Sequence, residues 1–150
     1  FEKDIFLLTF FDLVYSFGVI HHSPDTEKAL AEIYRVCKPG GTVKLMLYNR
    51  WSVNSYVTWF TRALLRGQPW RSLKWTMHYH IESIGTKAYR IPEVKKMISD
   101  VGGVDADVKT KLCFHDYSAT WGLLKLLRRG LARLLGNKAG WFMFIEFKKP

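Results

Sequence analysis

Two short apolar segments, separated by an amphipathic one, dominate the first third of the chain. Residues 12–17 are rich in strand-forming side chains and end at Gly18, and residues 42–48 form a second, almost wholly apolar run. Between them, apolar residues recur at helical spacing from Ala29 to Cys37, which indicates a helix with one buried face. The short links between strand, helix and strand predict a right-handed parallel crossover.

The ends of this helix carry recognisable boundary signals. Ser23 can cap the helix, and Pro24 suits its first position because the helix does not need the N–H that proline lacks. At the other end, Lys38-Pro39-Gly40-Gly41 is expected to stop the helix and reverse the chain tightly, since glycine permits conformations closed to other residues.

The remainder of the chain alternates between periodic segments and one aromatic stretch. Residues 68–90 show no clear period and are expected to form a partly helical cap. Residues 104–114 alternate between apolar and polar side chains, which predicts a strand near a sheet edge with one wet face. The elements expected here are helices over 52–66, 92–101 and 119–135 and strands over 104–114 and 141–147. The chain is accordingly divided into a lead (1–10), a strand–helix–strand core (11–49), a cap (50–90) and a carboxyl-terminal part (91–150).

Charge changes the picture because it is unevenly distributed. Residues 1–50 hold six basic and six acidic residues, whereas residues 51–150 hold seventeen basic and seven acidic ones, so this second part carries the whole net charge of +10. A basic surface of this kind either keeps the protein soluble or contacts an anionic partner such as a membrane or a nucleic acid.

The segment 119–135 is the clearest candidate for such a contact. At 100° per residue, its leucines gather on one side and its basic residues on the other. A basic amphipathic helix of this kind can lie on an anionic membrane surface; alternatively, its leucines pack on the sheet or on the helix 52–66. The two sets are Leu123, Leu124, Leu127, Leu131, Leu134 and Leu135 on the apolar side and Lys125, Arg128, Arg129 and Arg133 on the basic side.

The two cysteines, Cys37 and Cys113, fit no metal-binding or redox spacing. Both are expected to be reduced, which suits a cytoplasmic protein, with peripheral membrane contact as a further option. No run of the chain reaches the ~18 apolar residues of a membrane-spanning helix.

Two segments resemble a known family. Phe11-Asp12-Leu13-Val14-Tyr15-Ser16-Phe17-Gly18-Val19-Ile20-His21-His22 is similar to the fourth strand and following loop of class I S-adenosylmethionine-dependent methyltransferases, of the methyltransferase type 11 kind. The helix Ala29–Val36, which runs into Lys38-Pro39-Gly40-Gly41-Thr42, resembles the family's entry into strand five. The resemblance covers residues 11–49. It implies an α/β fold: the carboxyl-terminal half of a doubly wound, mostly parallel Rossmann-like sheet, with helical insertions and an antiparallel final strand.

Much of the family pattern has no counterpart in these residues. Family members hold S-adenosylmethionine with a glycine-rich loop after strand one, an acidic residue after strand two and a further residue after strand three, and none of these can be mapped here. The resemblance therefore implies that the intact enzyme binds S-adenosylmethionine and that this fragment alone is inactive. The apolar lead, residues 1–10, departs from the family's acidic turn, and we expect it not to be native sequence.

The resemblance also suggests site residues. Ligands of open α/β sheets sit beyond the carboxyl ends of the strands, where Ser16, Phe17 and Gly18 would border the methionine end of the cofactor. No catalytic residue is assigned, because such sites work largely by positioning and desolvating the reactants.

The acceptor side has two pairs of candidates. His21 and His22 would orient the substrate or accept a proton, or else fix the loop by hydrogen bonds. Asn49 and Arg50 would meet the substrate, or else cap a turn into the next helix. Because no third ligand stands at a recognised spacing from the histidines, no metal is expected.

The resulting hypothesis is methyl transfer from S-adenosylmethionine to a small-molecule or lipid-like acceptor in the intact enzyme. The alternative is a non-catalytic basic module that binds a membrane surface or a nucleic acid. A nucleic acid is the less favoured partner, because the sequence contains no recognised nucleic-acid-binding motif.

Overall fold

The computed structural model describes residues 10–118 and 122–150, and its centre is a mixed sheet in the order β1-β2-β5-β4, with the short β3 paired to β2. The strands are β1 (Phe11–Phe17), β2 (Cys37–Asn49), β3 (Ala88–Tyr89), β4 (Val104–Lys111) and β5 (Phe142–Lys148). The helices are α2 (Thr26–Val36), α3 (Val53–Arg62), α4 (Leu73–His80), α5 (Ile91–Asp100), α6 (Phe114–Tyr117) and α7 (Gly122–Leu135), and the 3-10 turns are η1 (Ile20–His22), η2 (Leu64–Arg66) and η3 (Gly136–Ala139).

The parallel crossover predicted from the sequence is confirmed. Strands β1 and β2 pair in parallel, with Ser16 opposite Leu45 and Phe17 opposite Met46. The antiparallel final strand is also confirmed, because β5 lies between β2 and β4 and runs antiparallel to both. Strand β4 is at the sheet edge, as its alternating pattern predicted.

The boundaries of α2 differ from the prediction at both ends. Asp25 caps the helix, accepting a hydrogen bond from the Lys28 N–H at 3.0 Å, while Ser23 and Pro24 precede the cap. The expected turn at residues 38–41 is instead part of β2, where an irregular register lets the chain pass from Cys37 to Thr42 while β1 advances from Phe11 to Leu13. Glycine absorbs this excess length: Gly40 has φ +78°, which favours glycine.

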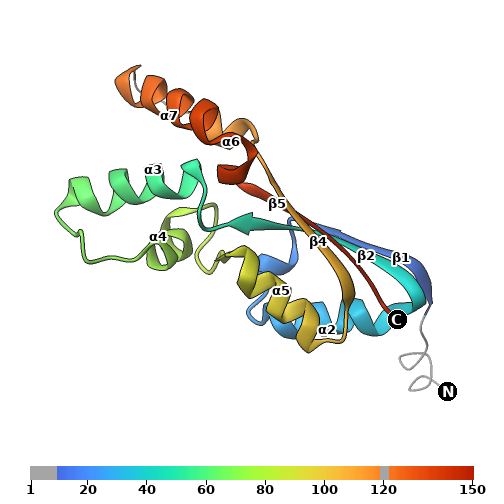
Figure 1. The fold of residues 1–150 in the computed structure, drawn as a ribbon. Helices are drawn as coiled ribbons and strands as arrows, with labels where there is room; N and C mark the ends of the chain where they lie inside the picture. Colours follow the sequence, from blue (N-terminus) through green and yellow to red (C-terminus); the bar gives the residue numbers. More distant parts are fainter. Residues whose placement is uncertain (1–9, 119–121) are drawn as a thin grey trace.

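Helices α2 and α5 lie on the same face of the sheet (Figure 1). The face of α5 that the sequence predicted is buried there, with Val94 2% and Ile98 1% exposed, and α2 contributes Leu30. The opposite face is uncovered along β1, where Leu13 and Tyr15 remain 54% and 64% exposed. Near the carboxyl end of β2 that face is closed by a smaller apolar cluster, composed of Met46, Tyr48, Met77, Ala88 and Trp141.

The remaining helices extend from the carboxyl end of β2, beyond the sheet (Figure 1). The aromatic segment, residues 68–90, is partly helical, as expected, and contains α4 and β3; its role as a cap stays a prediction. The predicted apolar face of α3 is only half buried: Val53 and Val57 pack inward, whereas Tyr56 and Phe60 are 50% and 41% exposed. Among the described residues, no helix combines the length and the apolar character needed to cross a bilayer.

The orientation of helix α7 corrects both interpretations drawn from the sequence, the one in which all four basic residues face outward and the one in which the leucines pack against the protein. Arg128, assigned to the basic outer side, is 7% exposed, and its guanidinium donates hydrogen bonds to the Asn54 side chain and to the carbonyls of His115 and Asp116. Of the six leucines predicted to share a side, only Leu124 packs against the rest of the protein; the others are exposed, Leu123 and Leu134 by 72% and 82%. Residues 119–121 of the expected helix, and residues 1–9 of the expected lead, lie outside the described residues.

Candidate functional site

The candidate site begins where β1 ends. Gly18 has φ +71°, and its N–H donates to the Met46 carbonyl at 3.3 Å, which holds the end of β1 against β2. A Cβ at this position would lie 3.3 Å from the Met46 side chain, so both the backbone conformation and the space favour glycine. The chain then forms the η1 turn, whose Ile20 carbonyl accepts a hydrogen bond from the Thr26 hydroxyl at 3.1 Å.

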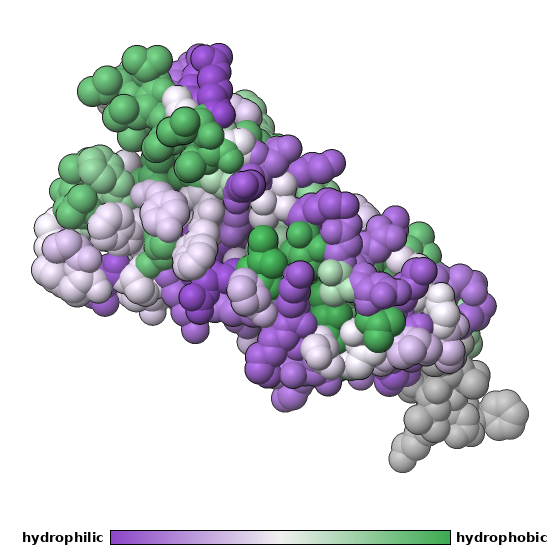
Figure 2. Space-filling model, viewed as in Figure 1, coloured by the Kyte–Doolittle hydropathy of each residue, from purple (hydrophilic) through white to green (hydrophobic). Residues whose placement is uncertain are grey.

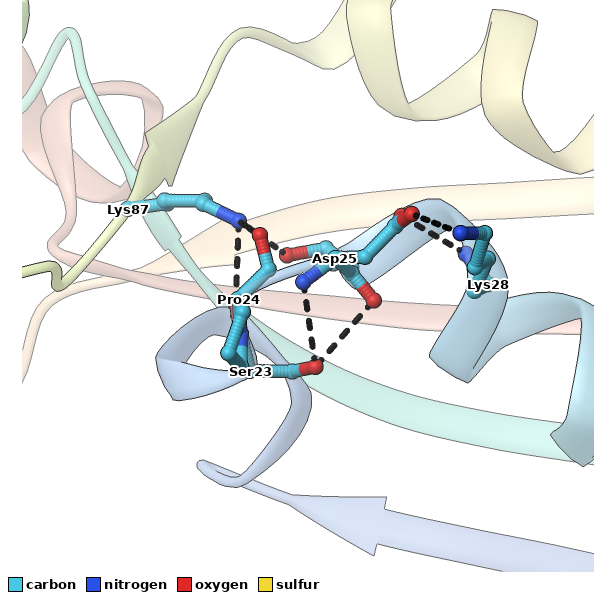
Figure 3. Close-up of polar contacts among 6 residues, drawn as sticks. Ser23, Pro24, Asp25, Lys28 and Lys87 are labelled. Carbon is cyan, nitrogen blue, oxygen red and sulfur yellow. Dashed lines mark hydrogen bonds and ion pairs between the residues drawn. The ribbon is translucent and has the colours of Figure 1, made fainter.

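A distant lysine fixes the loop between η1 and α2. Figure 3 shows Lys87 reaching across to this loop, where its Nζ donates to the carbonyls of Ser23 at 2.9 Å and Pro24 at 2.7 Å. The Lys87 backbone N–H also donates to the His21 carbonyl at 3.1 Å. The sequence analysis did not identify this residue, because a lone lysine in an aperiodic segment carries no signal.

His21 is completely buried beneath the loop. Its ring lies between those of His22 and Tyr48, with centroid distances of 4.2 Å and 4.1 Å. Neither ring nitrogen has a hydrogen-bond partner in the described part of the chain. Burial, assisted by the neighbouring His22, lowers the pKa of His21 to about 4, so the imidazole is neutral at neutral pH.

His22 belongs to a polar network that reaches the aromatic cap. Its Nε2 lies 3.3 Å from Oε2 of Glu82, and its Nδ1 lies 3.2 Å from the Thr86 hydroxyl. The other carboxylate oxygen of Glu82 accepts a hydrogen bond of 2.6 Å from the Tyr48 hydroxyl. Burial, followed by the effect of Glu82, raises the pKa of Tyr48 above its usual range, so the phenol stays protonated and remains a donor.

Glu82 is the functional candidate that sequence reasoning missed, because it lies far along the chain from the histidines. One ligand atom from each of His21, His22 and Glu82 lies within 4.8 Å of the others, and such a group could hold a metal ion. The sequence expectation of no metal depended on local spacing alone and stays a prediction.

The structure gives Asn49 and Arg50 partners within the protein. Asn49 is buried, donates to the carbonyls of Trp51 and Gly140, and accepts from the Trp51 N–H, which fixes the turn after β2. Arg50 donates to the Ala88 carbonyl at 3.0 Å and pairs with Glu93 at 3.0 Å. Both residues lie at the same sheet edge as Gly18, and their contact with a substrate remains a prediction.

The predicted cofactor residues lie beside the uncovered face. Ser16 is half-buried, and the Phe17 ring is 42% exposed and packs edge-on against Phe142. A separate cleft of about 470 Å³ is lined by residues that include Asp25, Lys87 and Glu93. None of Ser16 to Gly18, and neither His21 nor His22, lines it. The cleft and the predicted cofactor position are therefore different places.

Comparisons with known proteins agree with this geometry. Residues 5–45 match the family described as "Methyltransferase domain". Over 40 residues, the chain is 48% identical to phosphoethanolamine N-methyltransferase 2 of Caenorhabditis elegans, a match covering 27% of this chain and 9% of that protein. The family match begins inside the segment that the sequence analysis set apart as a lead.

Solved structures resemble nearly the whole chain. A Thermotoga maritima S-adenosylmethionine-dependent methyltransferase, described as a possible histamine N-methyltransferase, aligns with a TM-score of 0.56 and 17% identity over 95% of this chain and 57% of its own. Haemonchus contortus phosphoethanolamine N-methyltransferase 2, solved with S-adenosyl-L-methionine, aligns with a TM-score of 0.56 and 17% identity over 93% of this chain and 33% of its own.

The chain thus spans between a third and just over half of these two structures, and less than a tenth of the curated relative. At this level of identity, the structural likeness concerns the fold, whereas the family match concerns the residues around β1 and α2. Together with the observed sheet order, these findings show that residues 5–45 match a methyltransferase domain and that the described part of the chain has the fold of S-adenosylmethionine-dependent methyltransferases.

Proposed function

We propose that the intact protein transfers a methyl group from S-adenosylmethionine to a small-molecule acceptor. The observation that carries the proposal is the juxtaposition of the loop after β1 with the carboxyl end of β2, because open α/β sheets bind their ligands at such an edge. The family match over residues 5–45 supports it, since that match contains β1, its loop and α2.

The residues present fit one end of the cofactor. When bound, S-adenosylmethionine supplies an electrophilic methyl group on its sulfonium. Gly18 leaves the end of β1 free of a side chain, and the exposed Phe17 ring offers an apolar surface beside it. Ser16 to Gly18 would therefore border the methionine end, and the segments that hold the rest of the cofactor would precede this chain in the intact enzyme.

An amine is the acceptor that the site favours. A Glu82 carboxylate that is 43% exposed would attract a cationic amine, and Tyr48 fixes the orientation of that carboxylate. An amine becomes nucleophilic only after losing a proton, which the partly exposed His22 beside Glu82 is placed to accept. The names of the Caenorhabditis and Haemonchus relatives, both phosphoethanolamine N-methyltransferases, support an amine of this kind.

The test uses the intact protein with labelled S-adenosylmethionine and three acceptors: ethanolamine, phosphoethanolamine and phosphatidylethanolamine in vesicles. The expected result is label transfer to one of the soluble amines and a fall in kcat/KM of about tenfold or more in Glu82→Gln, because the substitution removes the carboxylate that attracts the amine. Lys95→Gln, an exposed site on α5, serves as the matched control and should keep full activity.

Transfer to the vesicle lipid alone would replace the small amine with a lipid-like acceptor, the second candidate, which the exposed leucines of α7 favour. Equal activity of Glu82→Gln and the parent protein would remove the role assigned to Glu82. No transfer to any amine by intact protein that binds the cofactor would contradict the proposed acceptor class.

A further inference from the structure

Helix α7 exposes most of its apolar side chains instead of burying them. Leu123, Leu126 and Leu134 are 72%, 69% and 82% exposed. Three more leucines, Leu127, Leu131 and Leu135, are between 43% and 55% exposed. Single exposed leucines need no explanation, but a contiguous apolar group on one helix indicates an interaction surface.

The docking of α7 explains why these leucines point outward. The stripe that contacts the rest of the protein is Leu124, Arg128 and Ala132, spaced four residues apart on one side of the helix. Ala132 is completely buried in a cluster with Val53 and Val57 of α3. The hydrogen bonds of Arg128 to Asn54 and to the His115 and Asp116 carbonyls lie on the same stripe and oppose rotation of the helix.

Three sides of α7 can therefore be distinguished. At 100° per residue, Leu123, Leu127, Leu131 and Leu134 lie on one flank of the docked stripe, and Leu126 lies opposite the stripe. On the other flank stand Lys125, Arg129 and Arg133, all exposed. A helix with an apolar stripe bordered by long basic side chains suits the boundary between lipid headgroups and acyl chains, since the basic groups can stay in water while the leucines enter the lipid.

The apolar surface continues onto the neighbouring helix. Phe60 of α3 is 41% exposed, and Leu64 and Leu65 of η2 are 38% and 67% exposed. Figure 2 shows the apolar side chains of α7 and of the adjoining end of α3 gathered on one part of the molecule. We call the exposed apolar residues of α3, η2 and α7 the leucine surface.

The charge around the leucine surface indicates which partner would bind there. The segments 51–81 and 117–145, which contain α3, η2, α4 and α7, hold nine basic residues and no Asp or Glu. A second copy of this chain docking there would bring like charges together, which is unfavourable. An anionic lipid surface satisfies both the basic groups and the exposed leucines.

We propose that the leucine surface docks the protein on an anionic membrane, with Lys125, Arg129 and Arg133 contacting the headgroups. Each basic residue near an anionic surface adds to the binding free energy, and the three residues together would strengthen binding about a hundredfold. The contribution falls as ionic strength rises, because salt screens exposed charges. This inference concerns binding alone and does not require the proposed methyl transfer.

The test is sedimentation of the intact protein, without cofactor or acceptor, with vesicles of phosphatidylcholine alone or mixed with phosphatidylserine. One variant changes Lys125, Arg129 and Arg133 to Gln, and a second changes Leu123, Leu126 and Leu134 to Gln. The control changes Lys28, Lys95 and Lys148 to Gln, which removes the same charge from exposed positions elsewhere. Thermal unfolding and analytical ultracentrifugation of every variant establish its folding and oligomeric state.

The parent and the control should sediment with the anionic vesicles and not with phosphatidylcholine alone. The basic variant should bind about a hundredfold more weakly, and the leucine variant should also lose binding while remaining folded. Equal binding by the parent and either α7 variant would overturn the proposal, as would equal loss in the control. If the parent binds neither vesicle type and is a dimer that the leucine variant no longer forms, the leucine surface instead binds a second copy of the chain.

Discussion

At the scale of single residues, His21 carries a cost in stability. A buried polar atom without a hydrogen-bond partner costs about 1–3 kcal/mol, and both ring nitrogens of His21 lack such a partner in the described part of the chain. The flat ring nevertheless fills the space between His22 and Tyr48. A polar group retained at this cost beside a predicted substrate edge is typical of a residue kept for function.

We therefore expect His21→Phe to separate stability from activity. The phenyl ring keeps the flat packing and removes the unpartnered nitrogens, so the free energy of unfolding should stay level or rise by about 1 kcal/mol. Methyl transfer by the intact protein should fall sharply. Urea unfolding and the activity assay, run on the same preparations, check both parts. A variant that is clearly less stable, or that is fully active, would show that His21 has only a packing role.

A second residue-scale prediction concerns the reactivity of Cys113. Burial, together with the Asp116 carboxylate, raises the pKa of this thiol from 9.0 to about 11. At pH 8, the thiolate population should therefore be about a hundredfold lower than for an ordinary cysteine, and thiolate is the reactive form. Alkylation of a Cys37→Ser variant at pH 8 should be slow in the native state and much faster in denaturant. A native rate equal to the denatured rate would contradict the raised pKa.

At the scale of elements, Arg128 determines how α7 sits on the protein. We expect Arg128→Met to lower the free energy of unfolding by about 1–3 kcal/mol, because it leaves the Asn54 side chain and two carbonyls without their donor. The neighbouring Arg129→Met changes an exposed position and should stay within about 0.5 kcal/mol of the parent. Chemical denaturation of both variants provides the comparison, and equal stability of the two would indicate that α7 is held by its apolar contacts alone.

Helix α7 also shows what the hydrophobic periodicity of the sequence can and cannot predict. The 3.6-residue pattern correctly predicts α2 and α5, and the two-residue pattern predicts β4, because each of these elements buries a single stripe or face against the sheet. On α7 the 3.6-residue pattern placed most of the exposed leucines on one side, but it grouped with them Leu124, which belongs to the docked stripe. The pattern cannot show which stripe docks. That choice depends on Asn54, which is 74 residues away from Arg128, and on the His115 and Asp116 carbonyls of α6, which lie outside the helix itself.

The candidate site likewise contains residues that the sequence predicts and residues that it does not. The loop with His21 and His22 is predictable because it follows a strand whose sequence resembles a family. Glu82 and Lys87 come from an aperiodic segment and reach the loop only through the tertiary fold. Local sequence therefore indicates where the site begins but not which distant side chains complete it.

At the scale of the whole molecule, the sheet is open at β1. Among the described residues, β1 pairs only with β2, and Leu13 and Tyr15 on its uncovered face are more than half exposed. We expect residues 1–150 alone to show no micromolar binding of S-adenosylmethionine, because most of the contact regions implied by the family resemblance are not found in them. They should also self-associate, since an unpaired strand edge invites pairing.

Calorimetry and analytical ultracentrifugation test this prediction together. The intact protein, which would supply the neighbouring strands, should bind the cofactor and remain dispersed under the same conditions. Micromolar cofactor binding by residues 1–150 in isolation would show that the edge of β1 and β2 suffices as a binding site.

The position of β5 has a consequence for the order in which the protein can assemble during synthesis. Strand β4 is made before β5 but joins the sheet only through it, because β5 lies between β4 and β2. While the ribosome makes the whole segment between Asn49 and Phe142, the long edge of β2 that will pair with β5 therefore stays open. Completion of the sheet awaits the synthesis of β5, and a nascent protein stalled before Phe142 would present that edge to any other strand within reach.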